Sequence, residues 1–246
     1  MKKIFKPIIQ YYLKVLTRIV LWRHKPLIIA VAGTTNKTFV KEMILDELGR
    51  SADVRGNPRS FNTEIGLPLA VLFLPSGYSS IFKWVDVLLA GTMVSIFSQS
   101  FPKILVLEMG VDRHGDMEYL LSLVQPKIAV ITTIDKSFPD NHTTLDDVAR
   151  ELGLLVESIP EDGLVLMGAY DERVRDLASK SKSRVIVFGK DDDCEAQIKN
   201  VRSVEMGQQF ELVWKGKTMK IETERYGTHN IDAIVAAKIV AEELKK

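Results

Sequence analysis

The sequence has few cysteines and little net charge, whereas many cysteines or a large net charge are typical of disulfide-rich secreted proteins, zinc-binding proteins and nucleic-acid-binding proteins. Among its 246 residues there is one cysteine, Cys194, and the formal net charge is +1. One cysteine excludes a disulfide framework and a zinc site built on cysteine ligands, and it fits a protein of the reducing cytosol. A balanced charge gives no electrostatic reason to expect nucleic acid as the main partner. Acidic neighbours around Cys194 should raise the pKa of its thiol, which makes a reactive role unattractive.

Long uninterrupted apolar runs are also scarce. Residues 1–25 mix seven Lys or Arg with many apolar residues, and no small-residue cleavage site follows. Such a segment suits neither a membrane span nor a signal peptide. Leu13, Leu16 and Ile19 or Val20 recur at helical spacing, so we expect either a helix packed on the following domain or a basic amphipathic helix touching a membrane surface through residues 4–22. Ile81 to Phe97, with only Lys83 and Asp86 charged, is expected to form a buried or docking helix.

The rest of the chain alternates between two hydrophobic patterns, without internal repeats or low-complexity linkers. Strands are expected at 27–32, 103–108, 127–133, 163–167 and 184–188. Helices are expected at 37–49, 63–73, 80–98, 116–124, 144–158, 171–181 and 228–244. This order predicts an α/β fold with a doubly wound, mostly parallel sheet whose ligands bind at the carboxyl ends of the strands. Residues 209–222 read as an antiparallel hairpin around Lys215-Gly216. We expect one domain, 27–246, preceded by a basic amphipathic helix, 1–26.

The first expected strand ends in a short polar loop that a helical pattern follows at once. The loop reads Gly33, Thr34, Thr35, Asn36, Lys37, Thr38. This is the layout of a phosphate-binding loop, in which backbone N–H groups face the anion, Lys37 reaches phosphate oxygens and the Thr38 hydroxyl can ligate Mg²⁺. Glycine normally precedes the lysine, and here Asn36 stands in its place. The alternative is an ordinary strand–turn–helix with a polar turn.

Several segments, taken together and in this order, carry a family resemblance that covers roughly residues 27–246. They are Gly33 to Thr38 with Val40-Lys41-Glu42-Met43-Ile44, Asn57 to Leu72, Leu107-Glu108-Met109-Gly110, Val130 to Ile134, Asp146 to Glu151, and Gly227-Thr228-His229-Asn230. The series resembles the central ATP-binding domain of the Mur ligases, most closely of the MurF type. That resemblance implies the P-loop Mur ligase fold, with ATP and Mg²⁺ as cofactors.

The resemblance also implies roles for individual residues. Lys37 and Glu108 would act on the transferring phosphoryl group, and Thr38 and Glu108 would hold Mg²⁺. Asn62 would lie near the phosphates, and His229 with Asn230 near the adenine. Read without the resemblance, Glu108 is a solvated acid after a strand, Asn62 and Asn230 are helix caps, and His229 lies on a surface loop.

At other positions the sequence departs from the family. Phe138 stands where the family has a metal-binding histidine, and His142 follows four residues later as a possible substitute. Leu152 occupies the position of a carbamylated lysine. Gly168 and Ala233 replace two asparagines.

The flanking UDP-sugar-binding and C-terminal domains of the family are not expected in this chain. The resemblance implies peptidoglycan precursor synthesis, in which ATP activates a carboxylate as an acyl phosphate and an amine then forms the amide. The expected partners are a nucleotide and either a UDP-muramyl peptide or a protein that supplies the remaining ligase domains. One alternative is a catalytically impaired nucleotide-binding or scaffold module of the same descent, and another is a plain P-loop ATPase or small-molecule kinase.

Overall fold

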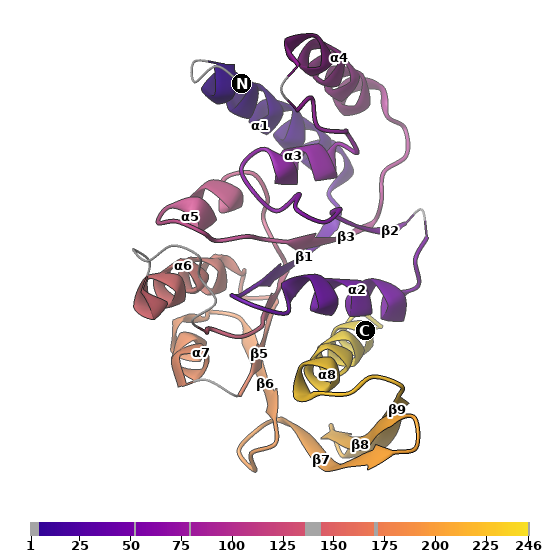
Figure 1. Cartoon of the computed structure of the whole chain (residues 1–246). Helices are drawn as coiled ribbons and strands as arrows, with labels where there is room; N and C mark the ends of the chain where they lie inside the picture. The colour runs from indigo at the N-terminus through magenta and orange to yellow at the C-terminus, as the bar shows by residue number, and fades with distance from the viewer. Residues whose placement is uncertain (1–4, 52, 79, 136–143, 170–171, 246) are drawn as a thin grey trace.

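One sheet runs through the whole molecule and positions every other element (Figure 1). The computed structural model describes residues 5–51, 53–78, 80–135, 144–169 and 172–245. In these residues the strands are β1 (Leu27–Ala32), β2 (Val54–Gly56), β3 (Ile104–Glu108), β4 (Ile128–Ile131), β5 (Leu164–Gly168), β6 (Arg184–Gly189), β7 (Ala196–Val204), β8 (Gly207–Trp214) and β9 (Lys217–Thr223). Their order across the sheet is β2-β3-β1-β4-β5-β6-β7-β8-β9. The pairs from β2 to β7 are parallel, and β7, β8 and β9 pair antiparallel.

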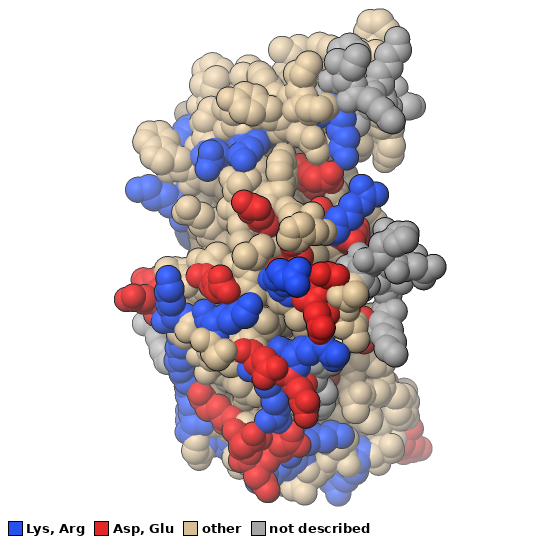
Figure 2. Space-filling model, turned by 90° about the vertical axis from the view of Figure 1, so that its left-hand side faces the viewer, with Lys and Arg blue, Asp and Glu red and all other residues tan. Residues whose placement is uncertain are grey.

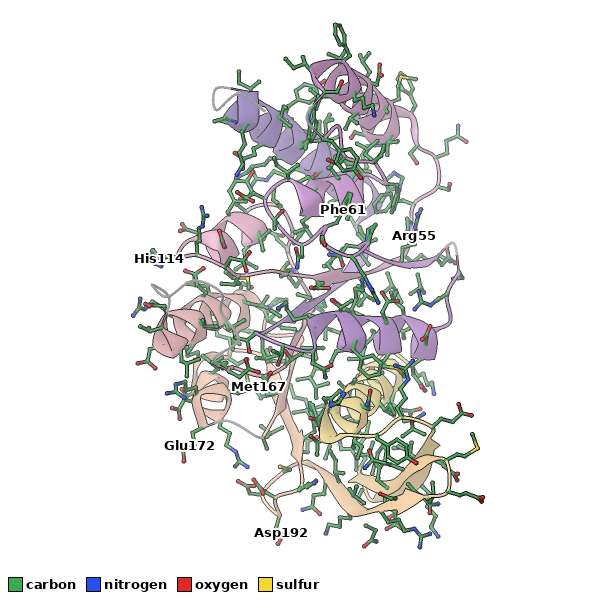
Figure 3. The ribbon with its side chains drawn as sticks, in the orientation of Figure 1. Arg55, Phe61, His114, Met167, Glu172 and Asp192 are labelled. Carbon is green, nitrogen blue, oxygen red and sulfur yellow. The ribbon has the colours of Figure 1, made fainter. Side chains whose placement is uncertain are left out.

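Helices cover both faces of this sheet because the strand side chains alternate between two apolar cores. The helices are α1 (Phe5–His24), α2 (Lys37–Leu48), α3 (Gly66–Val71), α4 (Ile81–Phe97), α5 (Asp116–Leu121), α6 (Leu145–Ser158), α7 (Glu172–Leu177) and α8 (Thr228–Glu243), with a 3₁₀ turn at Ala178–Lys180. Ile28 and Ala30 of β1 face the core shared with α1 and α3 to α7, whereas Ile29 and Val31 face α2 and α8. Met167 of β5 lies inside the first core, while Glu172 and Asp192 point outward (Figure 3).

The expected doubly wound, mostly parallel sheet is confirmed, and so is the hairpin that turns at Lys215-Gly216. Two strands were not predicted. The three residues of β2 are too few to show a period, and β7 is interrupted by a register shift between Lys199 and Arg202, with Asn200 at φ 54°. The helices expected at 63–73, 116–124 and 171–181 are shorter than predicted, because turns flank α3 and follow α5, and a 3₁₀ turn at Ala178–Lys180 follows α7.

The topology creates one place where strand ends diverge. The chain passes from β1 outward to β2 and β3, and then returns across β1 to β4. The loops after β1, β3 and β4 therefore meet at the carboxyl edge of the sheet, where open α/β sheets bind ligands.

The first helix, α1, packs on the domain behind it. One face of this helix is buried next to α3 and α4 through Ile9, Leu13, Leu16 and Val20. Helix α4 docks beside α1 through Trp84, Val87, Gly91 and Ser95, but its opposite face is exposed. The segment is thus a docking helix, of which only one side is buried. Over the described residues, none of the helices is both long and apolar enough to cross a membrane.

The packing of α1 can be tested through Leu13, whose side chain is fully buried. Leu13→Ala should lower the free energy of unfolding by about 2–4 kcal/mol, because it removes buried methyl groups and leaves a cavity. Tyr11→Ala on the exposed face of α1 is the matched control, with an expected change below about 0.5 kcal/mol. Urea unfolding measures the free energy of unfolding of both variants. Equal losses of this free energy would show that α1 does not pack on the domain.

Candidate nucleotide-binding site

The loop after β1 is held in shape by the strand on its other side, β4. Gly33 has φ 143°, and a Cβ at this position would lie 2.1 Å from Thr132 Oγ1, so only glycine fits. Thr34 donates from its backbone N–H and from Oγ1 to the Thr133 carbonyl, at 2.8 and 2.9 Å. The loop is therefore fixed to the end of β4 before any ligand is considered.

The residue that replaces glycine, Asn36, lies in the left-handed region with φ 66° and ψ 0°. Asparagine tolerates this conformation better than other residues with a Cβ. Its Nδ2 also donates to the His229 carbonyl, 2.8 Å away, at the start of α8. Asn36 thus keeps the backbone form for which glycine would be chosen, and it ties the loop to a helix far along the chain.

Lys37 begins α2 and turns its side chain back over the loop. Its Nζ donates to the carbonyls of Gly33 and Thr34, at 2.8 and 2.9 Å. Burial lowers the pKa of this ammonium, and the negative charges of Glu108, Asp112 and Asp135 partly oppose the shift. A partly buried cation held at the mouth of such a loop suits a phosphate.

Glu108 ends β3 with its carboxylate buried, which rules out a solvated acid. One oxygen accepts a bond from Thr38 Oγ1 at 2.8 Å, and the other accepts from Asn62 Nδ2 at 3.0 Å. Asn62 does not cap a helix, because α3 begins at Gly66 with Ile65 at the N-cap. The structure brings Thr38, Glu108 and Asn62 into one group.

Two residues that lie in the segments resembling the family, but to which the sequence gave no role of their own, hold this group in place. The Asn57 side chain bonds both backbone groups of Glu108: it accepts from the N–H at 2.8 Å and donates to the carbonyl at 2.9 Å. Lys41, itself fully buried on α2, donates to the Asn57 carbonyl at 2.6 Å and lies 2.9 Å from Glu42. In the sequence, the role of Lys41 was indicated only by a charged side chain that lies on the apolar face of the helix α2.

The loop after β4 contributes further polar atoms. Thr35 Oγ1 lies 2.6 Å from Thr133 Oγ1 and donates to an Asp135 carboxylate oxygen at 2.8 Å. Asp135 was also not predicted as part of the site, although its position directly after a central strand favours such a role.

His229 and Asn230 lie in the first turn of α8, whose N-cap is Gly227. Asn230 is not the cap: it is buried, and its Nδ2 donates back to the Tyr226 carbonyl and lies 3.2 Å from His229 Nε2. The His229 side chain is exposed, but it belongs to the helix and not to a surface loop. Through the bond from Asn36, this pair lies beside the loop.

The donor set fits magnesium held mainly by a nucleotide. Thr38 and Glu108 offer a hydroxyl and a carboxylate, which are the hard oxygen ligands that Mg²⁺ takes. Over the described ranges, no three His, Cys, Asp or Glu residues are grouped closely enough to hold a metal ion. Phosphate oxygens and water would have to complete the coordination.

The positions where the sequence departs from the family have different surroundings. Leu152 is fully buried in the core beneath the sheet, and Ala233 is fully buried in α8. Next to Leu152, the buried Glu151 accepts bonds from the N–H groups of Gly115 and Met117, and so fixes the start of α5 near His114 (Figure 3). Phe138 and His142 lie outside the described residues.

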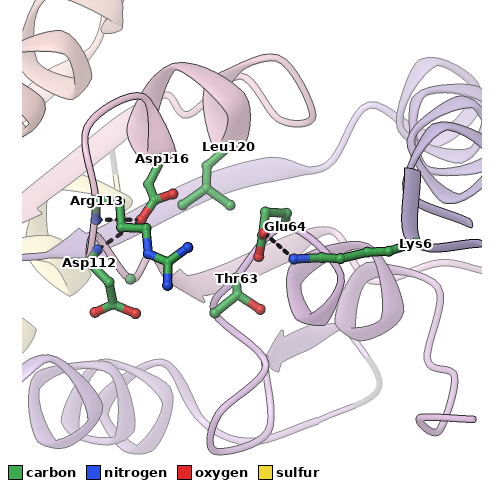
Figure 4. Close-up of a pocket in the computed structure, with 8 residues that line it drawn as sticks. Lys6, Thr63, Glu64, Asp112, Arg113, Asp116 and Leu120 are labelled. Carbon is green, nitrogen blue, oxygen red and sulfur yellow. Dashed lines mark hydrogen bonds and ion pairs between the residues drawn. The ribbon is translucent and has the colours of Figure 1, made fainter. Parts of the chain in front are cut away.

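A charged pocket of about 230 Å³ lies next to the end of β3 (Figure 4). It is lined by Lys6, Thr63, Glu64, Gly110, Asp112, Arg113, Asp116 and Leu120. Lys6 pairs with Glu64 at 2.9 Å, and the Asp116 carboxylate accepts from the N–H groups of Asp112 and Arg113. The pocket therefore offers charges of both signs beside the Glu108 group.

Away from the site, Cys194 is buried in the turn before β7. Burial is the main cause that raises the pKa of its thiol, and the Asp193 carboxylate adds to the effect. The expected direction is confirmed, with burial outweighing the acidic neighbours.

A family model described as the Mur ligase middle domain matches residues 90–241. The chain belongs to the Mur ligase family. Over 210 residues this Mur ligase chain is 29% identical to the UDP-N-acetylmuramoyl-tripeptide--D-alanyl-D-alanine ligase of Bacillus subtilis, covering 85% of the chain and 40% of that relative. With the same ligase from Escherichia coli the identity is 23%, over 85% of the chain and 42% of the relative. The chain thus spans about two-fifths of the curated relatives that it matches.

Solved structures agree on the fold. MurF ligase from Thermotoga maritima, in complex with ADP, superposes with a TM-score of 0.76 at 19% identity, over 97% of this chain and 50% of that one. A MurF structure from Acinetobacter baumannii gives 0.75 at 18% identity, over 96% and 47%. The Mur ligase fold therefore extends over nearly the whole chain, including the loop before residue 90 that the family model does not cover.

The support that Asn57 gives to Glu108 can be measured as stability. Asn57→Ala should cost about 1–3 kcal/mol of unfolding free energy, because it leaves buried backbone groups of Glu108 without partners. Gln125→Ala, which truncates an exposed amide, is the control and should change little. Chemical denaturation measures the free energy of unfolding of the two variants. If both variants have the same free energy of unfolding, Asn57 does not support Glu108 as described.

The left-handed conformation of Asn36 leads to a second test. Asn36→Gly should stay within about 1 kcal/mol of the parent, whereas Asn36→Ala should lose about 1–2 kcal/mol, since alanine resists positive φ. Thermal unfolding measured side by side separates the two variants. If alanine proves as stable as glycine, the backbone conformation is not what selects the residue at this position.

Proposed function

We propose that the chain binds ATP with Mg²⁺ at the loop 33–38 and serves as the nucleotide-binding part of a MurF-like ligase in peptidoglycan precursor synthesis. The observation that carries this proposal is the hydrogen bond between Thr38 and Glu108, which unites the loop with the end of β3. An ordinary polar turn gives no reason to bury a carboxylate against a loop hydroxyl, with Lys37 alongside. A MurF structure bound to ADP is among the structural relatives, which supports the choice of nucleotide.

Each residue of the site has a task in this proposal. The loop N–H groups and Lys37 bind the phosphates, and Thr38 and Glu108 supply oxygen ligands to the metal. Bound magnesium would supply charge neutralisation at the phosphates. Asn62 and Asn57 keep the Glu108 carboxylate directed at the loop through their hydrogen bonds.

The base of the nucleotide is assigned to the other side of the loop. A hollow there is lined by Asn36, Val40, Val130, Ile131, Thr132, Thr133, Gly168, Phe188, Asp232 and Ala236. The hollow measures only about 20 Å³ in this structure, so a purine ring would lie over its mainly apolar floor and not inside it. His229 with Asn230 lies next to Asn36 at its border. Gly168, which replaces an asparagine of the family, belongs to this lining and leaves room without offering a hydrogen bond.

The charged pocket beside β3 is assigned to the second substrate. Lys6 and Arg113 would attract the carboxylate and phosphate groups of a UDP-muramyl peptide, and Glu64, Asp112 and Asp116 would meet an amine. In the complete reaction, the substrate carboxylate attacks the γ-phosphoryl group of ATP and displaces ADP, which leaves an acyl phosphate. An amine then attacks the acyl carbon and displaces inorganic phosphate, and loss of a proton from the nitrogen gives the amide. We further propose that residues 27–246 form the central ATP-binding domain of the Mur ligase type, that 1–26 is its helical extension, and that the protein acts in the cytoplasm. A separate protein that supplies further ligase parts is an alternative source of the amine site.

A second candidate, a nucleotide-binding module that does not ligate, is favoured by Leu152. Where the family resemblance implies a carbamylated lysine, this side chain is fully buried among apolar residues. No rearrangement turns leucine into a metal or phosphate ligand. Nucleotide binding is common to both candidates, so it is the property to measure first.

Calorimetric titration of Mg²⁺ with a non-hydrolysable ATP analogue tests this property. We expect micromolar binding that Lys37→Ala weakens about ten- to a hundredfold, because a charged hydrogen-bond donor to phosphate is lost. Lys182→Ala, an exposed lysine far along the chain, should bind like the parent. An absence of heat at millimolar nucleotide, with all proteins folded, would refute both candidates.

A further inference from the structure

The two helices at one end of the molecule, α1 and α4, expose an unusual amount of apolar surface. On α4 the exposed apolar residues are Ile81, Phe82, Val85, Leu89, Met93, Ile96 and Phe97. Most of them recur three or four residues apart, so they form a stripe opposite the docked face of the helix. Phe82 is 85% exposed and Leu89 is 61% exposed. An isolated exposed leucine needs no explanation, but a continuous stripe does.

Helix α1 has a stripe of its own. Its exposed members are Ile8, Tyr11, Tyr12, Val15 and Trp22. Tyr12 Oη lies 2.8 Å from Thr92 Oγ1 of α4, which places the two stripes side by side. Figure 1 shows both helices at the same end of the molecule. Together the two stripes form one surface, named here the α1–α4 face.

Charges around this face are of one predominant sign. Apart from Lys6, which pairs with Glu64 in the charged pocket, the two helices contain Lys14, Arg18, Arg23 and Lys83 against a single acidic residue, Asp86. The whole chain, by comparison, has a net charge of only +1. Arg23 donates to the Ser95 and Ser98 carbonyls at the end of α4, which places this cation at the border of the face, whereas Lys14 donates to Ser122 at the end of α5. In Figure 2 the described part of this end is largely tan, with blue atoms and some red atoms below it.

We propose that the α1–α4 face binds the surface of an anionic lipid bilayer. An apolar stripe enters the boundary between head groups and acyl chains, and flanking Lys and Arg meet the lipid phosphates. Tyr11, Tyr12 and Trp22 are the side chains that favour this boundary, because each joins an apolar ring to a polar group. The contact expected of residues 4–22 thereby becomes a contact made by two helices, of which α4 supplies most of the apolar area.

A second copy of the chain is a poorer occupant of this face. Symmetric pairing would bring the same face of both copies together, and with it two sets of cations. Like charges placed opposite each other oppose association. An anionic surface meets the same cations favourably.

Flotation of the full chain with lipid vesicles tests the proposal. At low salt we expect the protein to float with phosphatidylcholine vesicles that contain roughly one third phosphatidylglycerol, and to be released by high salt. Trp22 offers a direct signal, since Trp84 and Trp214 are already buried. Tryptophan emission should therefore shift to the blue when the vesicles are added.

Matched variants distinguish this face from the rest of the surface. Leu89→Gln, and Phe82→Ser as a second variant, should each weaken vesicle binding about tenfold. Met206→Gln changes an apolar residue at the turn between β7 and β8, whose exposure of 71% lies between those of Leu89 and Phe82, and should bind like the parent. Circular dichroism confirms that all are folded. The proposal would be overturned if the parent protein failed to float at low salt, or if all three variants lost vesicle binding to the same extent. It would also be overturned if the parent protein did not bind vesicles but formed a dimer that Leu89→Gln abolished.

Discussion

The register of β3 against β1 is the constraint on which the candidate site depends. Val31 lies opposite Glu108, so the last side chain of β3 reaches the loop that follows β1. Because side chains alternate along a strand, a slip by one residue would turn Glu108 away from α2 and place Leu107 beside Thr38. The apolar cores on the two faces prevent such a slip, since Val106 and Leu107 belong to different cores. Packing of the sheet thus sets the chemistry at its edge.

Much of this arrangement could be read from the sequence, because it depends on local order. The apolar runs marked the central strands, and the loop 33–38 followed directly from one of them. The roles of Asn57 and Lys41 could not be read, since each depends on a partner at least 16 residues away. Asn62 shows the same limit: a local reading made it a helix cap, and a contact with Glu108 decided otherwise. The sequence also did not show that one side of α4 is exposed. Because this helix is mostly apolar on all sides, its pattern indicates burial but not which side is buried.

Asn36 and Leu152 both depart from the family pattern, but their physical consequences differ. Asn36 changes a side chain but keeps a backbone conformation, and its amide gains a partner in the His229 carbonyl. Leu152 changes the chemistry itself, because it places methyl groups where the family resemblance implies a polar group. The first departure is compatible with phosphate binding. The second bears on what happens after binding, which is why nucleotide affinity and amide formation are separable questions for this chain.

The bond from Asn36 to the His229 carbonyl spans 193 residues of sequence. During synthesis on the ribosome, the loop emerges long before α8 does, and domains acquire such distant contacts last. The phosphate loop can therefore reach its final form only after α8 has been translated. A nascent or truncated chain without α8 would lack both this hydrogen bond and the buried residues with which α8 covers one face of the sheet. In this protein the order of synthesis thus places a finished nucleotide loop after α8, although the loop itself is translated long before.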